Sequence, residues 1–413
     1  MTSLNKITSF YNERFGAMKK YFPEEVPSLN LKLSVVIPSY EEQLDGILKS
    51  LGNNKLPDSS EVEVVLVLNH SEISGQSVRD FHAKQYTNYH DTTLTNGVRV
   101  LCIKAFDLPK KKAGVGLARK IGMDAALNRF SEVNHDGLTV CLDGDCEVSP
   151  EYLTMLLKCE EAKINGLSIA FEHDVNSLDS QRNKQIIEYE IFLRYYVHAL
   201  RSAAYPHAFH TIGSSMASRA TAYAKIGGMN TRKAGEDFYF LHKLIPQGKF
   251  YDLTTTTVFP SARVSERVPF GTGRAMMEMN DGTKDFETLY NPKTFQDLGI
   301  LFFDEADALF GLSLKDFPKS FVAFLNQAGL SKQFEDLKAR SKDSIQFRKN
   351  FNHWMDGFKV LKYVHFCRDN FYPNLPLEEA LEGLFGFKKQ SRKGLLEELR
   401  EMDEKSLFHI FRL

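Results

Sequence analysis

The sequence predicts an α/β fold with a mostly parallel sheet flanked by helices, followed by a helical C-terminal addition. Short apolar runs rich in β-branched residues alternate with amphipathic helical segments over the first half of the chain, which is typical of βαβ units. From about residue 285 onward, charged sequence with helical periodicity replaces them. The 413 residues, 43% of them hydrophobic, suffice for roughly two to three domains.

Each expected strand is a short apolar run bounded by polar, Pro or Gly positions. The strands are expected at 33–40, 61–69, 97–105, 138–143, 167–172, 209–218 and 249–258. Apolar residues at helical spacing predict helices within the first ~30 residues and at 44–51, 78–86, 115–130, 150–165, 181–203, 219–226 and 236–245. We therefore expect an N-terminal helical extension (1–31), an α/β domain (32–280) and a helical C-terminal region (281–413).

Composition excludes several classes of protein. Lys+Arg is 52 and Asp+Glu is 53, so the net charge of −1 argues against a nucleic-acid binder that works by charge neutralisation. The five cysteines are odd in number, which favours a reduced, cytoplasmic location. They form no CxxC pair, so the sequence gives little support to a zinc site. The longest apolar run, Val64 to Leu68, is far short of the ~20 residues that span a bilayer. No transmembrane segment is expected, and peripheral attachment at a membrane stays open.

An acidic turn, "LTVCLDGDCEVSP" (138–150), follows the fourth expected strand. Asp143 and Asp145 can both approach a hard divalent cation such as Mg²⁺ or Mn²⁺, and Gly144 lets a ligand come close to the backbone. The alternative is an ordinary Asp-Gly turn. Parallel strands end at one edge of a sheet, so this turn should lie beside Pro38-Ser39-Tyr40 and Asn69-His70.

Three further segments hold candidate functional residues. "KKKAGVGLAR" (110–119) lacks the third glycine of a dinucleotide fingerprint, and it predicts either a phosphate-binding helix start or a solvated basic loop. Glu236 and Asp237 begin a helix after a Gly-rich loop. They could provide a catalytic base, or they could only interact with the helix dipole. Arg263 and Arg267 lie in a loop suited to phosphate recognition or in a plain surface loop.

The order of these motifs resembles the family-2 glycosyltransferases with the GT-A fold, over roughly residues 32–275. The segments that match are "SVVIPSYEE", "VVLVLN", "GVGLARKIGMDAAL", "VCLDGDCEVSPEYL" and "GGM…AGEDFYFLHKL". The resemblance implies that 32–280 is a nucleotide-sugar glycosyltransferase domain.

The resemblance also implies roles for individual residues. Asn69 stands where the family usually has an Asp that contacts the base, so UDP-, GDP- and other donors stay open, with a UDP-sugar favoured. Asp143 and Asp145 match the D-x-D motif, with Asp145 as the direct metal ligand, and Asp237 of the Glu236-Asp237 pair matches the base of inverting members. The remaining expected donor contacts are Pro38, Ser39, Tyr40, Glu42 and Arg119 by resemblance, and Gly116, Gly144, Arg263 and Arg267 on physical grounds alone.

The predicted function is a metal-dependent glycosyltransferase (a hexosyltransferase) that uses Mn²⁺ or Mg²⁺ and inverts the anomeric carbon. The acceptor hydroxyl would belong to a glycan, a lipid-linked molecule or a small molecule. Two alternatives share the fold: a catalytically inactive nucleotide-sugar-binding protein and a retaining enzyme. A sugar-1-phosphate nucleotidyltransferase fits less well because its glycine-rich signature should follow the first strand, where this chain has "PSYEE".

Overall fold

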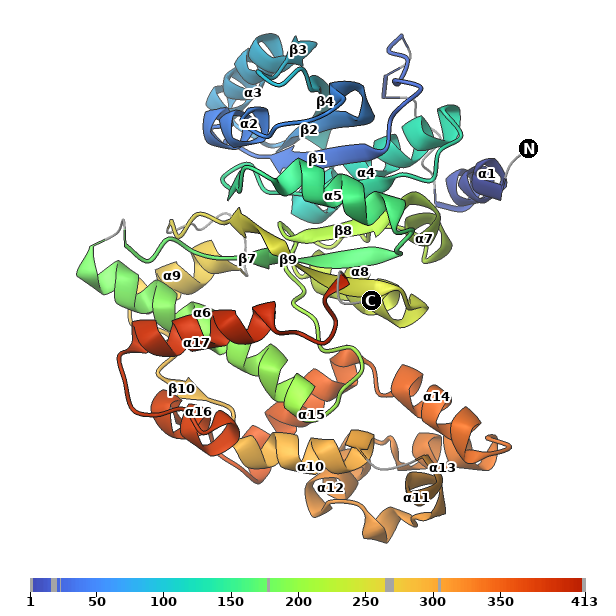
Figure 1. Ribbon diagram of the computed structural model, residues 1–413, viewed down its shortest axis with the longest axis vertical. Helices are drawn as coiled ribbons and strands as arrows, with labels where there is room; N and C mark the ends of the chain where they lie inside the picture. Colours follow the sequence, from blue (N-terminus) through green and yellow to red (C-terminus); the bar gives the residue numbers. More distant parts are fainter. Residues whose placement is uncertain are drawn as a thin grey trace. The chain divides into compact units, whose positions relative to one another are not determined.

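The computed structural model describes residues 3–15, 21–22, 24–176, 179–263, 271–303 and 306–410 (Figure 1). The chain forms two compact units. The first comprises Met1–Asp174, Thr211–Met277 and Asp403–Leu413, and the second comprises Val175–His210 and Glu278–Met402. These units interleave along the sequence, whereas the expected segments 1–31, 32–280 and 281–413 are consecutive. The expected segments stay a prediction about domain boundaries.

In the described part of the first unit, a nine-stranded sheet has the order β3-β4-β2-β1-β5-β8-β7-β9-β6. The parallel pairings join β1 with β2 and β5, β2 with β4, and β7 with β9. β8 runs antiparallel to its neighbours β5 and β7. The predicted fold class is therefore confirmed. The strands are β1 (Leu33–Ser39), β2 (Val62–Ser71), β3 (Thr92–Thr93), β4 (Arg99–Leu108), β5 (Leu138–Cys141), β6 (Glu147–Val148), β7 (Gly166–Phe171), β8 (Met216–Arg219) and β9 (Phe250–Phe259).

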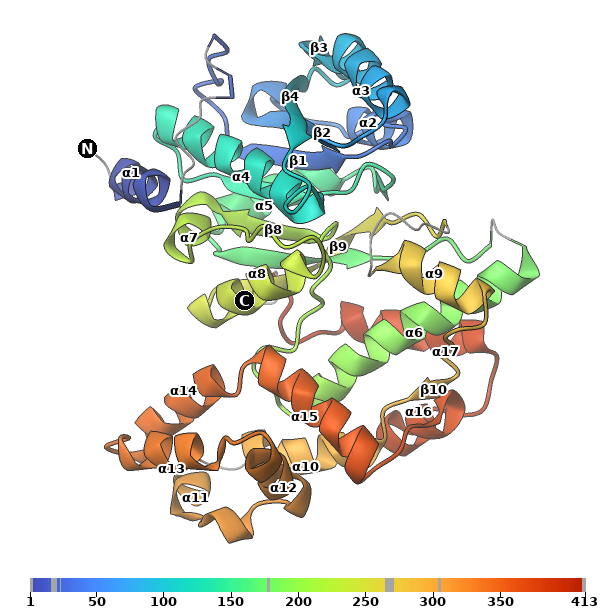
Figure 2. The ribbon, with the colours of Figure 1, turned by 180° about the vertical axis from the view of Figure 1, so that it is seen from behind.

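Helices cover both faces of this sheet (Figures 1 and 2). α4 lies on one face, and α2 and α5 lie on the other. The helices of this unit are α1 (Ser3–Phe15), α2 (Asp45–Gly52), α3 (Gln76–Tyr89), α4 (Val115–Glu132), α5 (Tyr152–Glu161), α7 (Ala220–Lys225) and α8 (Glu236–Leu244). α9 (Thr272–Asn280) begins in the first unit and ends in the second.

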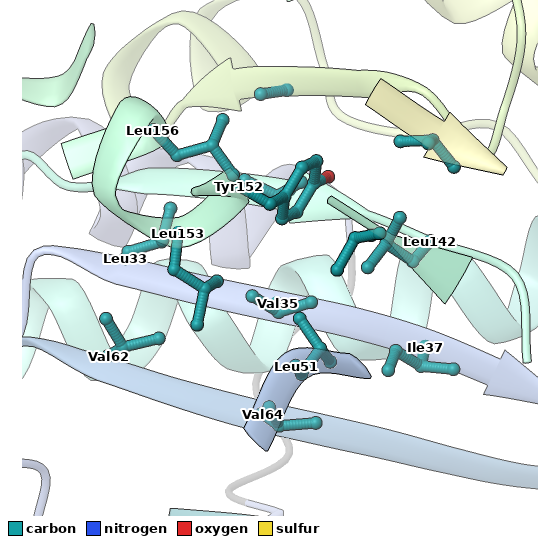
Figure 3. Close-up of a cluster of buried hydrophobic side chains, with 14 of the residues drawn as sticks. Leu33, Val35, Ile37, Leu51, Val62, Val64, Leu142, Tyr152, Leu153 and Leu156 are labelled. Carbon is teal, nitrogen blue, oxygen red and sulfur yellow. The ribbon is translucent and has the colours of Figure 1, made fainter. Parts of the chain in front are cut away.

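The alternation of side chains along β1 explains how two helical layers pack on one strand. Leu33, Val35 and Ile37 join the cluster formed with α2 and α5, shown in Figure 3. Val36 points to the opposite face, where a Cβ on Gly122 of α4 would overlap its side chain. Glycine at 122 thus lets α4 approach the sheet closely and fixes the position of the helix that holds Arg119.

The second unit is helical in its described residues, apart from a two-stranded pairing of β10 (Thr288–Leu289) with β11 (Leu375–Pro376). The predicted helical C-terminal region is confirmed. Aromatic side chains such as Phe321, Phe334 and Tyr363 are fully buried here and form much of the core. The helices are α6 (Ser180–Ser202), α10 (Pro292–Phe303), α11 (Ala306–Gly311), α12 (Lys319–Gln327), α13 (Ser331–Ala339), α14 (Ser344–Trp354), α15 (Gly357–Asn370), α16 (Leu377–Phe385) and α17 (Arg392–Glu404).

Three local expectations differ from the structure. Of the helix expected within the first ~30 residues, the described residues contain α1 (Ser3–Phe15), and residues 24–32 are irregular. Pro27 interrupts any helix there because it lacks an N–H group. The strand expected at 209–218 begins only at Met216, as β8. Residues 211–215 instead form an irregular connection that passes Arg119. β3 and β6 were not predicted because two residues are too few for a pattern.

Candidate active site

The carboxyl ends of β1, β2 and β5 place the sequence-predicted residues at one edge of the sheet. β1 is parallel to both neighbours, with Ser39 opposite Leu68 of β2 and Val36 opposite Cys141 of β5. Pro38 and Ser39 end β1, Asn69 lies near the end of β2, and the turn Asp143-Gly144-Asp145 follows β5. Sequence and topology therefore agree on where this edge lies.

Arg119 of α4 is the central cation of this edge. Its guanidinium donates to Asp143 Oδ1 at 2.5 Å and to Glu236 Oε1, and its side chain is only 4% exposed. A Cβ on Gly213 would overlap the guanidinium, so glycine there lets the connection before β8 pass over it. Burial opposes the charge, but Asp143, Glu236 and Asp237 raise the pKa of Arg119 and keep it protonated.

Gly116 is required for packing in this structure. A Cβ at this position would overlap the carbonyl oxygen of Arg232 and lie 3.0 Å from Cβ of Glu236. The first turn of α4 therefore lies directly against the loop that leads into α8. Its expected role as a donor contact stays a prediction, and the packing role was not expected from the sequence.

Replacing this glycine tests that close contact. We expect Gly116→Ala to lower the free energy of unfolding by about 1–3 kcal/mol, because a backbone carbonyl cannot move aside as a flexible side chain can. The matched control is Gly383→Ala in α16, where the new Cβ would meet only Pro292 at 3.4 Å. Because alanine is the better helix former, the control should be neutral or more stable by up to about 1 kcal/mol. Denaturant unfolding measures both, and equal behaviour of the two variants would contradict the packing role.

Glu236 and Asp237 open α8 directly after Gly235, whose φ of +67° is a left-handed conformation. Glu236 is buried and ion-paired with Arg119, whereas Asp237 is half-buried. Burial raises the pKa of both carboxyl groups, and Arg119 opposes that rise. The Asp237 carboxylate also accepts the N–H of Phe238 at 2.7 Å. Of this pair, Asp237 is the more exposed side chain.

Asp145 and Glu42 share a second guanidinium. Arg263 Nη2 lies 3.0 Å from Asp145 Oδ2 and is ion-paired with Glu42 Oε1. Burial, Asp143 and Glu42 raise the pKa of Asp145 to about 6, and Arg263 acts in the opposite direction. A Cβ on Gly144 would lie 3.1 Å from Cβ of Glu42, so the acidic turn packs closely against this residue. Arg267, the second expected loop arginine, lies outside the described residues.

A stack of rings supports the backbone that follows β1. The His82 ring stacks on His70 and Phe106, with Tyr40 at its edge. His82 Nε2 accepts the N–H of Glu41 at 3.1 Å, and Glu41 has the unusual φ of +53°. Burial, aided by His70, lowers the pKa of His82 to about 4, so the neutral ring that accepts this bond persists at neutral pH.

The supporting residues from α3 and from the 211–215 connection were not predicted. Gln85, one turn after His82, donates to the carbonyl oxygen of Glu42 at 2.5 Å. Neither residue belongs to a motif, and only the tertiary structure brings α3 to the loop between β1 and α2. Gly213 likewise gives no local signal, although "IGSS" resembles a turn sequence.

The described residues contain no group of three or more His, Cys, Asp or Glu side chains arranged to hold a metal ion. All five cysteines are buried and free. Within the same residues, no helix is both long and apolar enough to cross a membrane.

Comparisons with known proteins relate this edge of the sheet to a family. Residues 34–227 match the model of glycosyl transferase family 2. Among solved structures, TarS 1–349 from S. aureus in complex with UDP-GlcNAc is 16% identical, with 91% of each chain covered and a TM-score of 0.40. The mannosyltransferase PcManGT from Pyrobaculum calidifontis, in complex with GDP-Man and Mn²⁺, is 13% identical, with 89% of this chain and 99% of that chain covered and a TM-score of 0.37. No curated protein matches the sequence.

The segment 34–227 belongs to glycosyl transferase family 2, as the resemblance implied. The predicted enzyme class, a glycosyltransferase, is thereby confirmed. The matched segment includes the strand ends, Arg119 and the acidic turn, and it ends before Glu236 and Arg263.

Proposed function

We propose that this protein transfers a sugar from a nucleotide-diphospho-sugar to an acceptor hydroxyl, with inversion at the anomeric carbon. One observation carries the proposal: a single buried guanidinium, that of Arg119, joins Asp143 of the acidic turn to Glu236 of the α8 start. The acidic turn would bind the donor diphosphate, and the start of α8 would contact the acceptor. The ion pairs of Arg119 would fix the distance between the two segments and so orient the donor and the acceptor for reaction.

The acidic turn fits a divalent cation. Mg²⁺ is usually held by one or two carboxylates together with substrate phosphates, so a third protein ligand is not required. The side chains of Asp143 and Asp145 are 38% and 25% exposed, and both are hard oxygen donors. These two residues would hold Mg²⁺ or Mn²⁺, which would supply charge neutralisation on the leaving diphosphate.

The chain's own residues would perform the remaining steps. Tyr40, Glu42 and Asn69 at the strand ends would bind the nucleoside, with a UDP-sugar favoured. Arg263 would exchange its carboxylate partners for the donor diphosphate and help to stabilise the departing charge. Asp237 would accept the proton of the acceptor hydroxyl as its oxygen bonds to the anomeric carbon. The bond from that carbon to the diphosphate oxygen breaks in the same displacement, and the configuration inverts.

Donor binding and hydrolysis test this assignment. Wild type should bind one member of a panel of UDP-, GDP- and dTDP-sugars in the presence of Mn²⁺ and lose most of that binding with EDTA. Asp145→Asn should bind the same donor at least about tenfold more weakly, because it removes one charge from a metal ligand. The matched control is Glu147→Gln, an exposed carboxylate two residues away.

Each outcome has a distinct meaning. Metal-dependent binding that Asp145→Asn loses and Glu147→Gln keeps supports the donor site. Donor binding by wild type without any turnover would favour the inactive nucleotide-sugar-binding protein. Binding that is identical in all three proteins, with and without metal, would contradict the role of the acidic turn.

A further inference from the structure

Exposed cations from two loops meet beside the start of α8. One loop, 109–114, connects β4 to α4, and the other, 229–235, leads into α8. A Cβ on Gly114 would lie 3.3 Å from Cα of Lys233, so the two loops are in contact although they are more than one hundred residues apart in sequence. The cations are Lys110, Lys111, Lys112, Arg232 and Lys233, all exposed, and we call them the basic rim.

The basic rim lacks compensating acids. Among the described residues, no carboxylate forms an ion pair with any of its five side chains. The Glu72 carboxylate accepts the backbone N–H of Lys110 at 2.9 Å, and Asp107 is ion-paired with Arg79. A concentration of unpaired positive charge in a protein of net charge −1 costs self-repulsion, which a bound anion would relieve.

The basic rim lies on the acceptor side of the proposed site. The Gly116 contact places the carbonyl of Arg232 against the first turn of α4 and next to Glu236. The Arg232 guanidinium lies 3.7 Å from the ring centroid of Tyr239, one turn along α8 from Glu236. Stacking on an aromatic ring limits the freedom of this arginine and holds its charge beside α8.

We infer that the basic rim binds an acceptor glycan that carries phosphate or carboxylate groups near the hydroxyl to be glycosylated. This inference rests on the proposed function. Arginine and lysine recognise such anions by charge-assisted hydrogen bonds, and five cations can contact several anionic groups along an oligomer. Asp143 is ion-paired with Arg119, which is not part of the basic rim, so the rim and the donor diphosphate would use different cations.

Binding of two labelled probes tests the inference: a short-chain inorganic polyphosphate and an oligogalacturonate, measured by fluorescence anisotropy on the full chain. The quintuple variant that changes every rim cation to Gln should bind the preferred probe at least about tenfold more weakly, since each exposed charge contributes modestly. Raising the ionic strength should weaken wild-type binding in the same way. The matched control, Lys49→Gln with Lys55→Gln and Lys158→Gln, removes three exposed charges elsewhere in the first unit and should bind as wild type does.

Metal-dependent donor hydrolysis, measured on the same proteins, separates this inference from the proposed function. Loss of probe binding with unchanged donor hydrolysis supports the acceptor role. An equal loss of donor binding in the rim variant would assign the rim to the donor diphosphate and overturn the inference. Binding only to vesicles of anionic phospholipid, or the same loss in the control, would also overturn it. Probe binding by a wild type that binds no nucleotide-sugar would instead contradict the proposed function.

Discussion

Asp237→Asn is expected to lower sugar transfer by about 10²–10⁴-fold while donor binding persists, because a positioned base contributes that much to a proton transfer. Asparagine keeps an oxygen that can accept the N–H of Phe238, so the start of α8 should remain intact. The loss should therefore fall on kcat and not on the donor KM. Steady-state kinetics with the donor identified by binding would measure it.

The pH profile gives an independent test of Asp237. Burial raises the pKa of this carboxyl, and only its ionised form can accept a proton, so wild-type transfer should rise with pH through that raised pKa. Asp237→Asn should lose this rise. The matched control is Asp45→Asn, because Asp45 is also an acidic residue in a first helical turn and accepts a hydrogen bond from Tyr89 at 2.9 Å. A retaining mechanism would appear as near-normal transfer by Asp237→Asn, which would contradict the assignment of the base.

Arg119→Met is expected to lower the free energy of unfolding by about 3–5 kcal/mol, because it leaves buried carboxylates without their counter-charge. Methionine keeps the aliphatic part of the side chain, so the loss should come mainly from the missing guanidinium. The destabilisation should shrink as the pH falls: without Arg119 the pKa of buried Glu236 rises further, the folded state binds more protons than the unfolded state, and acid then stabilises the fold. Denaturant unfolding at several pH values would show this slope.

Two further variants identify the cause of the Arg119 effect. Arg119→Met combined with Glu236→Gln should recover part of the lost stability, because one uncompensated charge is removed. Arg129→Met is the matched control: Arg129 Nη2 lies 2.8 Å from Glu63 Oε2 in an equally buried pair outside the site. It should lose comparable stability and keep donor binding in its folded fraction, whereas Arg119→Met should lose both. Normal donor binding by Arg119→Met would contradict the link between the acidic turn and α8.

Much of the fold and of the strand-end edge was predictable because local sequence determines both. Runs such as "LSVVIPS" and "VEVVLVLNHS" are buried along nearly their whole length, and parallel strands bury both faces, so the pattern predicts strand type as well as position. Parallel strands also end at one edge. The meeting of Ser39, Asn69 and Asp143 followed from that rule alone.

Contacts between residues distant in sequence depended on the tertiary structure. Arg119 and Glu236 are 117 residues apart, and nothing in "GLAR" or "GEDF" shows that the two side chains form an ion pair. His82 supports Glu41 only because α3 packs beside the loop after β1. Charge pairing and close glycine contacts are pairwise properties of the folded chain. Local sequence thus determined the elements and the edge where they end, whereas the packing of helices on the sheet decided which charges meet there.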